Sequence, residues 1–215
     1  MTVNAGATVL IKSGDTVTLD GALIAASGSF VTFNSGANLI QYGTTNENTG
    51  AIVIKRESAR IKRLDYTMWS SPVAAQGLQA FSPNTLSNRF YSYNSSTNLY
   101  QAVDPSATNF SPFNGYLIRT PNTHPTTPAS WTGQFTGVPN NGTINMPILR
   151  GDYDGADYNT GVSATLATKD DDNWNLIGNP YPSAISANTL LFIYTLFCCF
   201  NYLFFAFTCA HGHYY

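Results

Sequence analysis

The sequence is poor in charged residues. Only 10% of its 215 residues are charged, against about 25% in an average soluble domain. The net charge is −2, so the chain lacks the excess of cations that a nucleic-acid groove needs, and we expect no nucleic acid among its partners. Glutamate, a good helix former, is also scarce. These shortages argue against a helical fold and against a charged tail.

Cysteine is missing from most of the chain. The three cysteines, Cys198, Cys199 and Cys209, all lie near the C-terminus. Residues 1–189 therefore have no disulfide framework, no thiol nucleophile and no cysteine ligand for a metal. Charged residues show the opposite distribution, because none follows Asp172. The chain thus consists of a body and a tail of different composition.

The residues that are abundant indicate β-structure. Serine, threonine, asparagine and glycine dominate, and 13% of the residues are aromatic, which is typical of short strands joined by tight turns. We predict an all-β protein. Residues 1–54 should form short β-solenoid-like repeats, and residues 55–188 a β-sandwich or jelly-roll-like domain. Residues 189–215 form an anomalous apolar tail that could be helical.

The N-terminal region contains a repeat. Gly6–Gly21 aligns with Gly28–Gly43 at an offset of 22 residues, and each unit has two β-rich runs around a Ser-Gly turn. A period near 20 with glycine corners favours the coils of a β-solenoid, in which each coil buries its apolar face against the next. We expect the solenoid to continue into Ala51–Ile54, and coils that precede the repeat could be missing. A plain antiparallel hairpin array is the alternative.

Five segments of the body resemble a known group of proteins. They are Tyr66–Val73, Phe90–Asn94, Gly115–Pro121, Phe135–Asn141 and Trp174–Ile185 (WNLIGNPYPSAI). Together they resemble recurring segments of large secreted proteins of Bacteroidota, mostly flavobacteria. In that group a Gly-rich solenoid-like stretch precedes such a β-domain, and a sorting domain for type IX secretion usually follows. The resemblance implies an extracellular or cell-surface location and brings no catalytic residue with it.

The sequence departs from this group at both ends. Met1 is followed directly by the repeat without a signal peptide, and the apolar tail stands where a sorting domain is expected. We therefore expect the chain to be a piece of a longer gene product.

The tail has three interpretations. Leu190–Ala210 is almost entirely apolar, apart from Thr195, Asn201 and Thr208. As a helix it would be long enough to span a bilayer, so a membrane is an expected partner only if the tail is a genuine anchor. The composition changes abruptly after Asn188 to residues with T-rich codons, which favours a frame shift or truncation. A buried core segment is the third alternative.

An acidic loop is the one candidate metal site. Asp152, Asp154 and Asp157 surround a glycine at spacings that would allow their oxygens to wrap a hard cation, and Ca²⁺ is the only cofactor that we consider. The loop lacks the length and the bidentate glutamate of an EF-hand. A solvated turn explains the same residues, and we favour that interpretation.

The tryptophans are the candidate ligand-binding residues. Trp69, Trp131 and Trp174 would bind a glycan if their rings were exposed, and would fill the core of a sandwich otherwise. His124 has no second histidine or cysteine near it in the sequence and makes a poor metal ligand or catalytic base.

Two functional hypotheses follow from these observations. The first is a non-catalytic secreted or surface module that acts in adhesion or in contact with polysaccharide, matrix or other surface proteins. The second is a glycan-active enzyme or its accessory domain. We favour the first, because no residues combine a nucleophile with a base, and we assign no catalytic residue.

Overall fold

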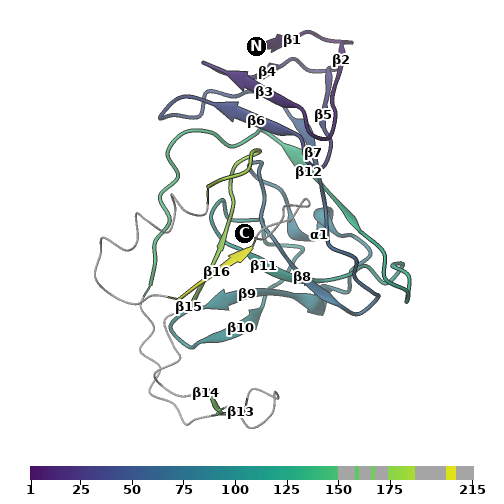
Figure 1. The fold of residues 1–215 in the computed structure, drawn as a ribbon, viewed down its shortest axis with the longest axis vertical. Coiled ribbons are helices and arrows are strands. Elements are labelled where there is room, and N and C mark those ends of the chain that lie inside the picture. The colour runs from purple at the N-terminus through teal and green to yellow at the C-terminus, as the bar shows by residue number, and fades with distance from the viewer. Residues whose placement is uncertain (150–157, 160–165, 168–173, 187–201, 207–215) are drawn as a thin grey trace.

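A computed structural model describes residues 1–149, 158–159, 166–167, 174–186 and 202–206 of the chain. It confirms the all-β prediction, since short strands make up nearly all of the regular structure in these residues. The exceptions are the single-turn helix α1 (Leu78–Phe81) and the 3-10 turn η1 (Ser87–Arg89). The N-terminal strands lie at one end of the molecule, and β7 and β12 run from them into the body (Figure 1).

The N-terminal repeat folds as two stacked coils of parallel strands. Each strand of the first coil pairs in parallel with the strand 22 residues later, as Val9 with Val31 and Val17 with Leu39. The pairing of equivalent residues at this offset confirms the solenoid-like prediction and excludes a hairpin array. The strands are β1 (Thr2–Val3), β2 (Thr8–Ile11), β3 (Thr16–Leu19), β4 (Ile24–Ala25), β5 (Phe30–Phe33) and β6 (Asn38–Gln41).

Gly50 lies at the corner where the chain passes from the second coil into a third, and no other residue fits there. Gly50 has φ +81°, as its counterparts Gly6 and Gly28 have φ +77° and +81°. This left-handed conformation costs an L-residue about 1–2 kcal/mol. At Gly50 a Cβ would in addition lie 1.8 Å from the carbonyl oxygen of Ala25. The stacking of the coils therefore requires glycine at this corner.

The next strand joins the solenoid to the body. β7 (Ile52–Glu57) pairs in parallel with β5 and antiparallel with β12 (Thr132–Gly137), which gives a sheet of order β12-β7-β5-β2. Ile54 lies beside Phe33 on one side and Phe135 on the other, and all three are almost fully buried. The boundary predicted at residues 54 and 55 falls inside this strand, so the sheet continues across it.

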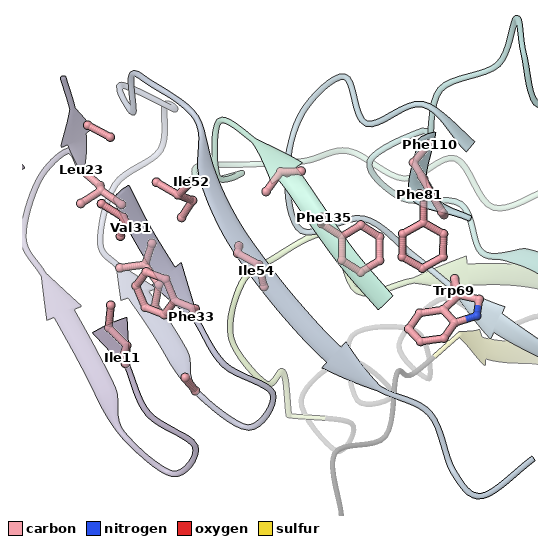
Figure 2. Packing of buried hydrophobic residues seen from close by; sticks show 14 of the residues in the cluster. Ile11, Leu23, Val31, Phe33, Ile52, Ile54, Trp69, Phe81, Phe110 and Phe135 are labelled. Atoms are coloured by element: carbon pink, nitrogen blue, oxygen red, sulfur yellow. The ribbon is translucent and has the colours of Figure 1, made fainter. Parts of the chain in front are cut away.

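The body is built on a second, antiparallel sheet. Its order is β10-β9-β11-β8, and the inner face carries Trp69, Phe90, Tyr116 and Ile118, all buried. Aromatic side chains fill the space between this face and β12, and Figure 2 shows the core running from the solenoid into this cluster. The strands are β8 (Tyr66–Trp69), β9 (Phe90–Asn94), β10 (Leu99–Ala102) and β11 (Tyr116–Arg119).

The segment Trp174–Ile185 (WNLIGNPYPSAI) connects the N-terminal solenoid to the body. After β15 (Trp174–Gly178), the carbonyl of Pro182 accepts hydrogen bonds from the backbone N–H of Leu39 at 3.1 Å and from Nη2 of Arg56 at 3.1 Å. The Arg56 guanidinium lies in the core, and this burial lowers its pKa to about 10. The motif therefore has a structural role at the junction.

The described part of the tail is a strand, so the prediction of a helical tail is wrong for these residues. β16 (Tyr202–Ala206) pairs in parallel with β15, with Phe204 beside Leu176. Its tyrosine and phenylalanines favour strands, and the edge of β15 offers backbone partners. Two further short strands, β13 (Tyr158–Asn159) and β14 (Leu166–Ala167), pair with each other. Within the described ranges, no helix has the length and apolarity to cross a membrane.

Candidate functional site

The acidic loop does not enter the site described below. Asp152, Asp154 and Asp157 lie outside the residues that the structure describes. Within those residues, no group of three or more His, Cys, Asp or Glu side chains is arranged to hold a metal ion. The Ca²⁺ site at the acidic loop stays a prediction.

The structure decides between the two interpretations of Trp69. This side chain is 1% exposed and contacts Trp131 edge-on, with 5.1 Å between the ring centroids. Trp131 is half-buried against the same core, and Trp174 is half-buried on β15. A ligand at the surface cannot reach the ring of Trp69, which fills the core as the alternative interpretation predicts.

Tyrosines form an aromatic surface on the opposite side of the second sheet. Side chains alternate between the two faces of a strand, so the residues next to the buried Phe90 and Trp69 point away from the core. The outer face carries Tyr66 from β8, Tyr91 and Tyr93 from β9 and Tyr100 from β10. We call these four residues the tyrosine face.

The rings of the tyrosine face lie in two pairs. Tyr66 and Tyr91 have ring centroids 6.0 Å apart at an interplanar angle of 59°, and Tyr93 meets Tyr100 edge-on at 5.2 Å. Tyr66 is 38% exposed and Tyr100 is 37% exposed. The face therefore consists of two aromatic pairs on one sheet and is partly open to solvent.

The hydroxyl groups at this surface are held in defined positions. Nη1 of Arg89 donates to the hydroxyl oxygen of Tyr91 at 3.4 Å, and that hydroxyl donates to the carbonyl of Asn88 at 3.2 Å. The hydroxyl of Tyr93 donates to Oδ1 of Asn98. Fixed hydroxyls next to ring faces provide both polar and apolar contacts.

Tyr66 and Tyr100 stay uncharged to higher pH than an ordinary tyrosine does. Burial, followed by the proximity of Tyr91, raises the pKa of Tyr66, although Arg89 and Arg119 act in the opposite direction. Burial also raises the pKa of Tyr100. Near neutral pH their hydroxyl groups can therefore both donate and accept hydrogen bonds.

Sequence reasoning missed this surface, although a signal was present. In the run Phe90–Asn94, aromatic residues stand at adjacent positions, so they must lie on both faces of a strand. One face of this run is the core, and Tyr91 and Tyr93 must then lie on the other. The tryptophans are weaker candidates for a binding surface than these tyrosines, because large aromatic residues more often fill a core.

A small cavity lies at the junction of the two regions. Its volume is about 250 Å³, below the 300–1,000 Å³ or so that is typical of small-molecule sites. The hydroxyl of Tyr181 at its wall donates to the carbonyl of Gly142 at 2.8 Å, which ties two segments of the wall together. We assign this cavity to the packing of the junction. Its lining residues are Leu39, Ile40, Gln41, Gly43, Asn140, Asn141, Gly142, Tyr181, Pro182 and Ser183.

His124 is buried and helps to hold two segments of the chain together. It is 7% exposed, and its Nε2 lies 2.9 Å from the carbonyl oxygen of Ile61. This contact joins the loop that contains His124 to the segment after β7.

The chain belongs to the family described as domain of unknown function DUF8693, whose model matches residues 1–195. The match includes the solenoid, the second sheet and β15. No curated protein and no solved structure matches the chain.

Proposed function

We propose that the chain is a non-catalytic module that contacts polysaccharide through the tyrosine face. The observation that carries this proposal is the placement of Tyr66, Tyr91, Tyr93 and Tyr100 together on the outer face of one sheet. Aromatic side chains in a soluble protein favour the core or an interface, and a group of them on a surface indicates a binding site.

The shape of the surface fits a polymer. Neighbouring strands lie about 4.8 Å apart, so the four strands of the sheet span about 14 Å. Tyr66 and Tyr100 come from the two edge strands of this sheet, and the aromatic residues therefore extend across its width. A chain of sugar rings can lie along such a surface, with C–H groups against the aromatic rings and hydroxyls against the tyrosine O–H groups.

An extracellular or cell-surface location is part of the proposal. It is supported by the resemblance of the five body segments to secreted proteins of Bacteroidota. The composition agrees with it, since a surface rich in serine, threonine and asparagine offers many hydroxyl and amide groups to the hydroxyls of a polysaccharide. We propose adhesion, or attachment to a polysaccharide matrix, as the role of the module.

The experiment is affinity electrophoresis in native gels that contain a polysaccharide. We expect the wild-type chain to be retarded by at least one polysaccharide of a panel, and Tyr91→Ala and Tyr100→Ala to lose that retardation. Tyr42→Ala is the matched control, because Tyr42 is 62% exposed but lies just after β6 in the solenoid. Equal retardation of all variants, or no retardation by any polysaccharide, would contradict the proposal.

An assay for released reducing ends separates the module from a glycan-active enzyme. A glycosidase needs two carboxylates about 5–10 Å apart across the scissile bond. We expect no release from a polysaccharide that binds. Release that is lost on substitution of an aspartate or glutamate would show that the chain is an enzyme.

A further inference from the structure

We propose that one end of the tyrosine face is a subsite for a carboxylate, so that the preferred ligand is a polysaccharide that contains uronic acids. This inference rests on the proposed function and adds the chemical class of the ligand. It is carried by two arginines, Arg89 and Arg119, that lie beside Tyr66 and Tyr91.

Both arginines lie at the same end of the tyrosine face. Arg119 on β11 is paired with Tyr66 on β8, and Ile118 is paired with Phe90 on β9. Arg89 ends η1 and directly precedes Phe90, and both arginines are close enough to Tyr66 to act on its pKa. Tyr66, Arg119 and Arg89 therefore lie together at one end of the tyrosine face.

Within the described residues, neither guanidinium is hydrogen-bonded to a carboxylate. Arg89 donates to the hydroxyl of Tyr91, and Nη2 of Arg119 donates to Oδ1 of Asn122 at 2.8 Å. The Nε atoms of both arginines are buried without a hydrogen-bond partner among these residues. Since these Nε atoms are buried, an external acceptor meets the Nη groups, which carry four of the five N–H donors of each guanidinium.

Charge complementarity defines that acceptor as an anion. Two cations at the same end of a surface raise the local electrostatic potential and attract a negative group. The hydrogen bond from Arg89 to Tyr91 is the main reason that the pKa of Arg89 is raised, so this cation keeps its charge. The planar guanidinium matches a carboxylate with two parallel hydrogen bonds.

The tyrosines specify where the rest of the ligand lies. With Tyr66 and Tyr91 only 6.0 Å apart, a sugar ring that packs on either of them brings a substituent within reach of Arg89. A uronic acid carries its carboxylate directly on the ring. The arrangement thus couples stacking of the sugar with recognition of its acidic group.

The test compares binding of polygalacturonate with binding of the same polymer after methyl esterification. A charge-assisted hydrogen bond contributes about tenfold or more in affinity, so we expect the wild-type chain to bind the acid form about tenfold more tightly at low salt. In Arg89→Gln the ratio of the two affinities should fall to about one, with both forms measured on the same variant. Lys12→Gln is the matched control, because it removes the same charge from an exposed position in the solenoid.

Thermal unfolding of each variant confirms that it is folded, and Arg89→Lys should restore part of the preference if charge is the reason. Equal affinity of the wild type for the two forms would overturn the inference and leave the proposed function intact. An equal loss in Lys12→Gln would also overturn it, as would equally tight, Arg89-dependent binding of a sulfated polymer. Absence of binding to both forms and to every neutral polysaccharide would contradict the proposed function itself.

Discussion

The rings of Tyr66 and Tyr91 lie 6.0 Å apart although β11 separates their strands, β8 and β9. Two strands separated by a third are about 10 Å apart at the backbone, so these rings must lean toward each other above β11. Arg119 on β11 is only 9% exposed although it lies on the outer side of the sheet. The Tyr66–Tyr91 pair therefore lies across the middle strand and extends the tyrosine face from β9 to β8.

Substitution of Gly50 tests the stacking of the coils. In Gly50→Ala the Cβ would overlap the carbonyl of Ala25 in addition to the strain of φ +81°. Gly28→Ala has the same φ but meets no atom within 4 Å, so it should cost only about 1–2 kcal/mol. We expect Gly50→Ala to lower the free energy of unfolding by clearly more than Gly28→Ala in denaturant titrations. Equal losses would show that the coils are not packed as described.

Trp69 should be essential for stability. Its ring is 1% exposed and contacts Phe81, Trp131 and Phe135. Removal of a buried tryptophan typically costs about 3–5 kcal/mol, and we expect a loss of this size for Trp69→Ala in chemical unfolding. Tyr100 is partly exposed to solvent, so Tyr100→Ala should lower the free energy of unfolding by much less. A small effect of Trp69→Ala would place this ring outside the core.

The solenoid could be predicted from the sequence because its signal is local and repeated. Gly6, Gly28 and the apolar residues between them recur at an offset of 22, and the strands pair at that offset. The surface of the second sheet could not be predicted in the same way, because β8, β9 and β11 come together from distant parts of the chain. Only that pairing shows that Tyr66 lies near Tyr91.

The tail shows the same limit of sequence reasoning. An apolar run is compatible with a membrane helix, with a core helix and with a strand, and length alone favours the helix. Tyr202–Ala206 instead finds a partner in β15, a strand that precedes it by more than twenty residues in the sequence. Trp69 was ambiguous for a related reason, since the identity of a residue does not reveal which face of its strand is covered.

Tyr66 and Tyr100 should titrate at high pH. The pKa values of Tyr66 and Tyr100 are raised above the ordinary value of 10.0. The unfolded chain loses these protons near pH 10 while the folded chain retains them, so the free energy of unfolding should fall as the pH rises above about 10. We expect a late step in the ultraviolet titration of tyrosinate that is reduced in Tyr66→Phe. A single step at the ordinary value would contradict the described surroundings of these residues.

Removal of the tail should leave the body folded. The members of the main hydrophobic cluster lie between Val3 and Phe135, and β16 adds an edge strand to β15. We expect a chain truncated after Asn188 to unfold within a few degrees of the full chain and to be more soluble, because it exposes fewer apolar residues. A loss of many degrees in the thermal midpoint would show that the tail is a required part of the core.

The most direct measurement of the central claim is a titration of the chain, with its tyrosine rings labelled with carbon-13, by a polysaccharide that retards it in native gels. Tyrosine-to-phenylalanine variants assign the ring signals. We expect the signals of Tyr66, Tyr91, Tyr93 and Tyr100 to shift together with one affinity, and the signal of Tyr42 in the solenoid to stay unchanged. Shifts at Tyr42 or elsewhere, with no change at the four residues of the tyrosine face, would contradict the assignment of this surface as the binding site.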